Sequence, residues 1–409
     1  MRKLVFVLII AFMLAPFALA ADKVVTFYGS IRVMTFVDDR DAEMIGGTGG
    51  LWDDSDTTWD TEPWTSRLGV NFNLGDVTGN VELRPGYTSL PYSTHATSTN
   101  SGMVRHWYGA WKVGPGKLIV GQTWTPTFVG LMESNIASDY MQGGSNGADV
   151  AGSLRVTGLQ YHMPVGAGTL KIALLKPVVS HASDAAEITL VNSAAGYVQD
   201  DDSTLPRFEV SYSTKISRVE FGLLGGYNSS TIEMHGSLAT DPTYSYDVDS
   251  YIYGGWFNLD FKPAYIKGSI TAGQNWANYG VANTFNDSTG ATAYNPTATT
   301  AAIADASNLS YGLVVGFVAN DKITLEGWYY HSESSMSFTD LGDAYTWDTE
   351  FDTYGAILIW KVAENVYIMP EIAFYDAGQT TTYTNGVANV IPVENGTQTQ
   401  YGICWKINF

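Results

Sequence analysis

The chain has 409 residues, and its 41 aspartates and glutamates outnumber its 21 lysines and arginines, which gives a formal net charge of −20. This acidic balance argues against a nucleic-acid partner, because phosphate backbones are bound by clustered basic residues. The one cysteine, Cys404, excludes a disulfide framework, and no cysteine and histidine spacing of a zinc or cytochrome site is present. We therefore predict no cofactor and no metal.

The first twenty residues have the pattern of a secretory signal peptide. Arg2 and Lys3 form a basic start, an apolar run follows, and Ala18, Leu19 and Ala20 give the small-x-small pattern of a cleavage site. The alternative is an uncleaved membrane anchor. After residue 20, no run approaches the ~18–20 apolar residues of a transmembrane helix, which excludes a helical membrane protein. We predict a signal peptide over 1–20 and one exported domain over 21–409.

Segments with period-two alternation recur throughout this domain. In the first, Phe27 and Ile31 lie on one face and Tyr28, Ser30 and Arg32 lie on the other. This is the pattern of a strand with one apolar and one polar side. Sixteen such strands are predicted, over 23–37, 65–75, 79–89, 104–113, 116–124, 154–164, 168–178, 205–214, 217–228, 248–262, 264–274, 307–319, 322–333, 350–362, 365–377 and 399–409.

The connections between these strands alternate in length. Tight turns such as GDVTG, VGPG, PVGAG and AND alternate with long segments of about 14–32 residues. Transmembrane barrels of the outer membrane have an even number of strands, short turns at one end and long loops at the other. Backbone groups in lipid must all be hydrogen-bonded, so the sheet has to close. We predict an all-β fold, a closed antiparallel transmembrane β-barrel of sixteen strands with a water-filled interior.

The negative charge is concentrated in the eight long segments. They hold 26 acidic residues and one basic residue, Arg40, whereas the remaining strands and turns hold 15 acidic and 18 basic residues. We interpret this as a solvated acidic surface at the loop end. A calcium site in DDSDTTWD, residues 53–60, is an alternative, although this stretch lacks the glycine of an EF-hand loop.

Residues 105–128 resemble a signature region of the general Gram-negative outer-membrane porins. They read RHWYGAWKVGPGKLIVGQTWTPTF, an Arg-led strand, a glycine turn and a second strand that leads into a long third loop. SRLGVNFNLGDVTGNVEL and LRVTGLQYHMPVGAGTLKIAL are similar to other strand pairs of this family, and FYGS near the start and the terminal Phe409 also fit. The resemblance covers most of the first 180 residues and the last strand. It implies a homotrimer of sixteen-stranded barrels in the Gram-negative outer membrane.

The resemblance also implies that the third external loop, here about 125–153, folds into the barrel and forms a constriction with the wall. The loop lacks the family's usual Pro-Glu-Phe-Gly-Gly stretch, so which acid faces the pore stays open, with Glu133 as the first choice. The loop candidates are Glu133, Asp139 and Asp149, and the basic wall candidates are Arg67, Arg105 and Arg155, extended by Arg32 and Arg84.

The location of these arginines can also be inferred without the resemblance. Arginine stays charged at any working pH and is costly in lipid, so arginines at inward positions line water. Opposed rings of charge create a transverse field across a narrow opening, which favours dipolar solutes. The alternative is a structural role in which the arginines pair with inward acids such as Glu82 or Glu209.

Two sets of large side chains are harder to place. In strands four to six, Trp107, Trp111 and Leu159 fall on the nominal inner face, which pushes His106, Gln160 and His162 outward. Contact with protein in a trimer, a misjudged register or a bulge would each explain this pattern. Tryptophans near strand ends predict interfacial girdles, with a lumen track for sugar rings as the alternative. They are Trp111, Trp124, Trp256, Trp328, Trp360 and Trp405.

The last strand, YGICWKINF, places Tyr401, Trp405 and Phe409 on the lipid face. We predict that it closes the barrel against the first strand near Tyr28. The resemblance implies that the terminal phenylalanine, with the aromatic residues before it, is read by the outer-membrane assembly machinery.

Together these patterns predict a porin, a channel for passive diffusion of ions and small hydrophilic solutes. Besides these solutes and the assembly machinery, its predicted partners are outer-membrane lipid and lipopolysaccharide. One alternative is a channel selective for a sugar or an organic anion, and another is a mainly structural envelope protein. An enzyme is not predicted, because a nucleophile needs a base within reach and the histidines are scattered. They are His95, His106, His162, His181, His235 and His331.

Overall fold

The computed structural model describes most of the chain, and the predicted signal peptide lies outside the described residues. These are 24–41, 56–62, 66–84, 104–133, 155–177, 198–203, 205–235, 243–281, 292–297, 300–340, 343–384, 387–388, 393–394 and 396–409. No helix found among them combines the length and the apolar character that crossing a membrane would require.

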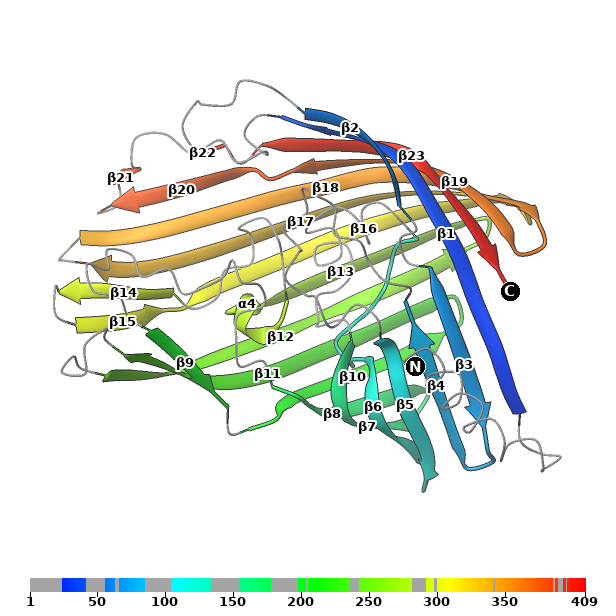
Figure 1. The fold of residues 1–409 in the computed structure, drawn as a ribbon, viewed down its shortest axis with the longest axis horizontal. Helices are drawn as coiled ribbons and strands as arrows, with labels where there is room; N and C mark the ends of the chain where they lie inside the picture. Colours follow the sequence, from blue (N-terminus) through cyan, green and yellow to red (C-terminus); the bar gives the residue numbers. More distant parts are fainter. Residues whose placement is uncertain are drawn as a thin grey trace, which may run out of the picture.

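Sixteen antiparallel strands form a closed barrel, in which each strand pairs with the next and the last pairs with the first (Figure 1). All sixteen predicted strands are present, so the predicted closed antiparallel β-barrel of sixteen strands is confirmed. The barrel strands are β1 (Val24–Arg40), β3 (Arg67–Asn73), β4 (Val77–Leu83), β5 (Val104–Val113), β6 (Gly116–Trp124), β7 (Arg155–Val165), β8 (Gly168–Leu175), β10 (Arg207–Ile216), β11 (Val219–His235), β12 (Thr243–Phe261), β13 (Ala264–Gln274), β16 (Ala306–Asn320), β17 (Ile323–Asp340), β18 (Asp343–Ala363), β19 (Val366–Asp376) and β23 (Thr397–Asn408).

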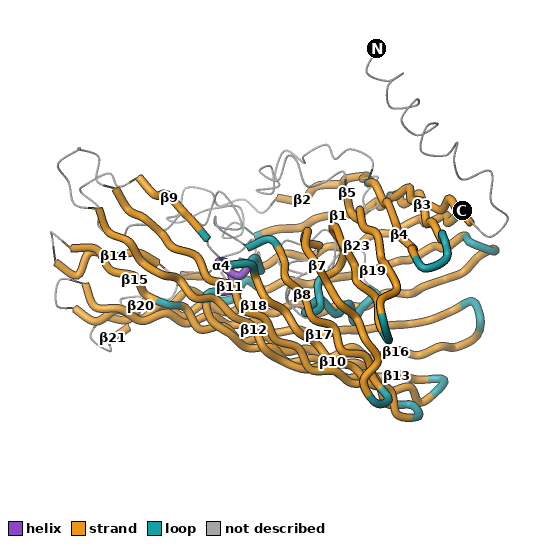
Figure 2. Tube along the Cα trace, turned by 90° about the horizontal axis from the view of Figure 1, so that it is seen from below, coloured by secondary structure: helices purple, strands orange, loops and turns teal. Residues whose placement is uncertain are grey.

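Short turns gather at one end of the barrel, as the sequence predicted (Figure 2). At the other end, the prediction of a long loop is wrong for two of the connections. Residues 229–247 and 334–349 mostly continue the ladders of β11 with β12 and of β17 with β18, which reach His235–Thr243 and Asp340–Asp343. These extensions were missed because they lack the apolar outer face of the membrane-facing parts. Buried Met336 and Phe338 pack beside Trp347 there.

Smaller elements lie at the loop end. They are β2 (Asp56–Glu62), β9 (Val198–Asp202), the hairpin β14 (Thr292–Thr297) and β15 (Thr300–Ala304), β20 (Gln379–Thr384), β21 (Val387–Ala388), β22 (Val393–Glu394) and the short helix α4 (Trp276–Tyr279). Strands β2, β9 and β20 extend the sheet by pairing with β1, β11 and β18.

The barrel closes where the chain ends. The backbone N–H of Gly29 donates to the carbonyl of Phe409 at 2.9 Å, and the N–H of Phe409 donates to the carbonyl of Gly29 at 3.1 Å. A Cβ on residue 29 would lie 2.4 Å from the Phe409 ring, so glycine leaves room for that side chain. The predicted seam near Tyr28 is therefore confirmed.

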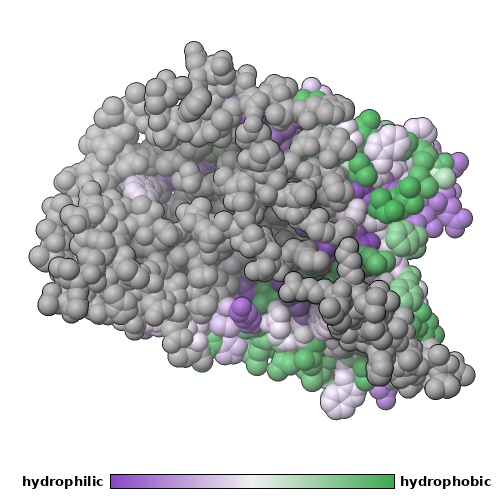
Figure 3. All heavy atoms as spheres, viewed as in Figure 1, coloured by the Kyte–Doolittle hydropathy of each residue, from purple (hydrophilic) through white to green (hydrophobic). Residues whose placement is uncertain are grey.

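Alternation sorts the side chains of each strand between the two sides of the barrel. Phe27, Ile31, Leu223, Trp405 and Phe409 are among the exposed apolar residues of the outer side. In the space-filling view, hydrophobic side chains are visible along the right-hand part of the molecule (Figure 3). An apolar outer face is what a transmembrane barrel presents to lipid.

The inner side is not polar throughout, in contrast to the predicted lining. A buried apolar cluster covers part of it, because two chain segments, 125–133 and 275–281, pack onto inward apolar side chains and shield them from water. The barrel contributes Met34, Phe36, Leu224, Ile252, Val314, Trp328, Tyr330, Phe351, Ile357, Met369, Ala373, Tyr375, Ala377 and Cys404, and the two segments contribute Leu131, Trp276, Tyr279 and Val281.

This cluster corrects part of the girdle prediction. Trp328 is 5% exposed inside the barrel and Trp256 packs against the same cluster, so neither lies in an interfacial girdle. Trp360 and Trp405 are exposed on the outer side, as a girdle requires, and so is Trp111, which the alternation of its strand had placed on the inner face. Parity explains the two errors. Buried Ile252 lies four residues before Trp256, and buried Glu326 lies two residues before Trp328, so both tryptophans share the inward face of their strands.

Candidate functional site

A charged cluster on the inner wall is built around Glu82. Its carboxylate accepts from the Arg105 Nε at 2.7 Å and from the Tyr28 hydroxyl at 2.8 Å, and the Arg67 Nη1 lies 3.8 Å away. Arg67 also donates from its Nε to the Ser30 hydroxyl at 3.4 Å. Because β1, β3, β4 and β5 are neighbours in the barrel, their inward residues form one continuous polar wall. It joins two of the predicted arginines with one of the acids proposed as structural partners.

A bulge in β5 explains the irregular alternation there. Glu82 is opposite His106, but the next residue, Leu83, is opposite Val104, so Arg105 is an extra residue. Arg105 and His106 are therefore both buried on the inner side, while Trp107 and Trp111 are about half exposed. The inner-face assignment of these two tryptophans was wrong, and the bulge is the reason.

In β7 the alternation is regular, but the predicted parity was one residue out. Leu159 is 47% exposed and Gln160 is 1% exposed, the reverse of the prediction. His162, also predicted to point outward, shares the inward parity of Gln160. Arg155, the first residue of β7, is opposite Trp124, and its guanidinium lies 4.4 Å from the centre of that ring. Trp124 in turn is in edge contact with His106, so Arg155 lies near the Glu82 cluster although it shares the outward parity of Leu159.

The two remaining predicted arginines lie on β1 and just after β4. The backbone of Arg32 exchanges hydrogen bonds with the Ser66 hydroxyl, at 2.9 and 3.0 Å, and Arg32 is directly opposite Lys406. Arg84 follows the last residue of β4.

The described start of the third loop, residues 125–133, contacts the inner side of strands far from β6. The backbone N–H and hydroxyl of Thr127 donate to the Glu209 carboxylate at 3.0 and 2.9 Å. Glu209 is fully buried on β10, and its neighbour Phe208 is exposed on the outer side. We call residues 125–133 the inner segment.

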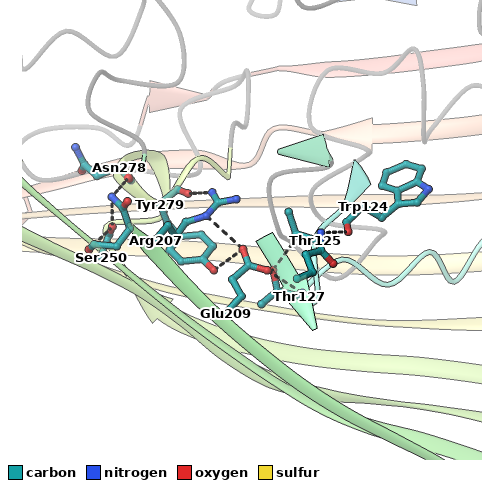
Figure 4. Close-up of polar contacts among 10 residues, drawn as sticks. Trp124, Thr125, Thr127, Arg207, Glu209, Ser250, Asn278 and Tyr279 are labelled. Atoms are coloured by element: carbon teal, nitrogen blue, oxygen red, sulfur yellow. Dashed lines mark hydrogen bonds and ion pairs between the residues drawn. The ribbon is translucent and has the colours of Figure 1, made fainter. Parts of the chain in front are cut away.

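Glu209 also joins the inner segment to α4. In Figure 4 its carboxylate lies between Thr127 and the pair Arg207 and Tyr279. The Tyr279 hydroxyl donates to it at 2.9 Å, and the Arg207 Nε lies 3.3 Å away. Arg207 donates in addition to the backbone carbonyl of Tyr279 at 2.8 Å.

A second buried carboxylate holds the far end of the inner segment. Glu326 on β17 accepts from the backbone N–H of Glu133 at 2.7 Å and from the Tyr265 hydroxyl at 2.6 Å. Lys267 on β13 lies 3.4 Å from the same carboxylate and donates to the backbone carbonyl of Leu131. Between these anchors Leu131 is buried in the apolar cluster. The inner segment thus runs from β6 past β10 to β13 and β17.

Of the three predicted loop acids, Asp139 and Asp149 lie outside the described residues, and Glu133 has an exposed side chain at the end of the inner segment. Glu133, Arg32 and Arg67 all interact electrostatically with Lys406 on β23, an inward lysine 5.5 Å from the centre of the Tyr367 ring. The first-choice acid thus interacts with a wall lysine that also interacts with two of the predicted wall arginines.

Sequence reasoning missed three members of the site. Glu326, Lys267 and Tyr279 carried no motif, and only inward parity on their strands could have pointed to the first two. Within the described part of the chain, no group of three or more histidine, cysteine or acidic residues is placed to hold a metal ion. The side chains of the calcium alternative, residues 53–60, lie outside what the structure describes.

No family model matches the chain, and no curated protein matches it in sequence. Solved structures of outer-membrane proteins share its fold. The outer membrane channel DcaP of Acinetobacter baumannii is 14% identical and gives a TM-score of 0.57 over 95% of this chain and 98% of its own. OmpT of Vibrio cholerae, also 14% identical, gives 0.53 over 95% and 99%. Salmonella typhi OmpF, 13% identical, gives 0.51 over 94% and 97%. At these identities the likeness shows the fold, a porin-like sixteen-stranded barrel.

Proposed function

We propose that this protein is a porin of the Gram-negative outer membrane, a water-filled channel through which ions and small hydrophilic solutes diffuse passively. The observation that carries the proposal is the charged cluster on the inner side of a closed barrel whose outer side is apolar. Arginines and carboxylates that face inward are at low cost only where they meet water or each other. The proposal needs no chemistry on the solute, and therefore no catalytic group.

The narrowest part of the channel is proposed to lie between the inner segment and the wall of β1, β3 and β5. Its two buried anchors, Glu209 and Glu326, support a fixed position for residues 125–133. The electrostatic interaction of Glu133 with Lys406, which is directly opposite Arg32, supports opposed charges across the opening. We propose that the rest of the loop, up to residue 153, continues this inward course and that Asp139 and Asp149 add to the acidic side.

Liposome swelling tests the proposed diffusion directly. Vesicles that contain the refolded protein should swell in a series of uncharged sugars at rates that fall as the sugar becomes larger, because passage is limited by size. Vesicles with heat-denatured protein are the control. Swelling no faster than that control for the smallest sugar would contradict the proposal.

Replacing Arg105 by glutamine should move ion selectivity toward cations. One unit charge acting across about 10 Å of water changes the energy of a monovalent ion by about 0.4 kcal/mol, in opposite directions for a cation and an anion, so the cation-to-anion permeability ratio should rise about fourfold. Reversal potentials in a potassium chloride gradient measure this ratio. Arg218→Gln, at the exposed turn between β10 and β11, is the matched control. An unchanged ratio in Arg105→Gln would remove this residue from the constriction.

We further propose export through cleavage of residues 1–20, assembly as a homotrimer, and recognition of the last strand by the assembly machinery in contact with lipid and lipopolysaccharide. Deleting Phe409 should lower the amount of folded barrel in the outer membrane, because it removes both the aromatic terminus and the backbone bonds to Gly29. Phe409→Ala keeps those backbone bonds and isolates the side chain. Heat-modifiable mobility of membrane fractions reports the folded amount. Wild-type levels in both variants would contradict a signal at Phe409.

A further inference from the structure

A row of basic side chains crosses four neighbouring strands near the tight-turn end. Lys112 on β5 is directly opposite Lys117 on β6, Lys117 is opposite His162 on β7, and His162 is opposite Lys171 on β8. Directly opposite residues of antiparallel strands point to the same side, so the four lie on one side of the sheet. Like charges at such positions repel and destabilise the pairing.

Three other inward basic residues each lie beside a buried acid, whose negative charge offsets theirs. Arg105 lies beside Glu82, Arg207 beside Glu209, and Lys267 beside Glu326. Lys117 and Lys171, by contrast, form no ion pair with any residue in the described ranges. The ring of His162 is held by Gln160, 3.0 Å from its Nε2. Two ammonium groups are therefore held on either side of His162, and no carboxylate of the described wall is paired with them.

These residues line a cavity inside the barrel. Its volume is about 760 Å³, and its lining includes Lys117, His162 and Lys171 together with Tyr108, Trp124 and Phe128. The rings of Trp124 and Phe128 are stacked, with centres 4.0 Å apart. Ligand sites of about 300–1,000 Å³ typically combine aromatic walls with a few placed polar groups. Lys112 is exposed and is not part of this lining.

We propose that this cavity binds a small organic anion that carries an aromatic ring. The anionic group interacts with Lys117 and Lys171, which supplies the missing negative charge, and the ring packs against the aromatic side of the cavity. Phe128 belongs to the inner segment, so the cavity lies beside the proposed narrow part of the channel. This inference deepens the proposed function. It rests on that function only for the role of the bound anion as a solute that passes through the channel.

Benzoate is the test probe, with benzamide as its neutral counterpart and acetate as the anion without a ring. Binding is measured by calorimetry on the refolded protein in detergent, which does not depend on conductance. Benzoate should bind more tightly than both comparison solutes. The double variant K117Q/K171Q should raise the Kd for benzoate at least about tenfold, since both charge-assisted contacts are lost. K112Q, in the same row but outside the cavity, should leave the Kd within about twofold.

Equal binding of benzamide and benzoate by the wild-type protein would overturn the proposal without any variant. Unchanged benzoate affinity in a K117Q/K171Q protein with a native circular dichroism spectrum would overturn it as well. Binding of benzoate by a protein that conducts no ions would support the site and reject the channel. Conductance without preference for benzoate would reject the site and keep the channel.

Discussion

Replacing Glu209 by glutamine is expected to lower the free energy of unfolding by about 3–5 kcal/mol, because the change removes the carboxylate that offsets the charge of the fully buried Arg207. Glutamine keeps the size of the side chain but offers Thr127 and Tyr279 only a neutral acceptor. The loss therefore reports on charge and not on packing.

Urea unfolding of the refolded protein, followed by tryptophan fluorescence, measures this difference. Glu364→Gln, at the exposed turn between β18 and β19, is the matched control and should change the free energy of unfolding by less than about 1 kcal/mol. If Glu209→Gln cost no more than this control, Glu209 would not be the anchor that joins the inner segment to β10 and α4.

The second large effect is expected at Trp328. Truncation of Trp328 to alanine should lower the free energy of unfolding by about 3–5 kcal/mol, because it leaves a cavity in the apolar cluster inside the barrel. Trp360→Ala, which removes the same side chain from the exposed outer side, should cost less than half as much. The same urea experiment compares them. Equal losses would contradict the assignment of Trp328 to the interior.

Most of the barrel was predictable because its strands obey one simple rule. Where one side of a strand faces an apolar environment and the other faces water, residues alternate, and Phe27, Ile31 and Tyr28 show this directly. The rule fails where its cause is absent. The extensions of β11, β12, β17 and β18 beyond the apolar outer face were therefore predicted as loops.

The candidate site was less predictable, because alternation does not say which segments enter the barrel. The bulge at Arg105 reverses the parity of β5 and cannot be seen in a single strand, since it depends on the pairing with Glu82 and Leu83. Packing of residues 125–133 and 275–281 turns inward apolar residues such as Trp328 and Tyr330 into a core. Pairing of Arg105 with Glu82 was expected only as an alternative, and the contact at 2.7 Å shows that this structural pairing is present.

Planar-bilayer recording of the purified, folded protein tests the central claim most directly. A porin of this architecture should insert in discrete conductance steps whose size grows with salt concentration, because ions cross through water. If the protein is the proposed trimer, its channels should close in groups of three conductance steps. Circular dichroism should first show that the protein is folded as β-sheet. If such protein inserts into the bilayer and gives no conductance at any salt concentration, the claim that this barrel is an open channel is contradicted.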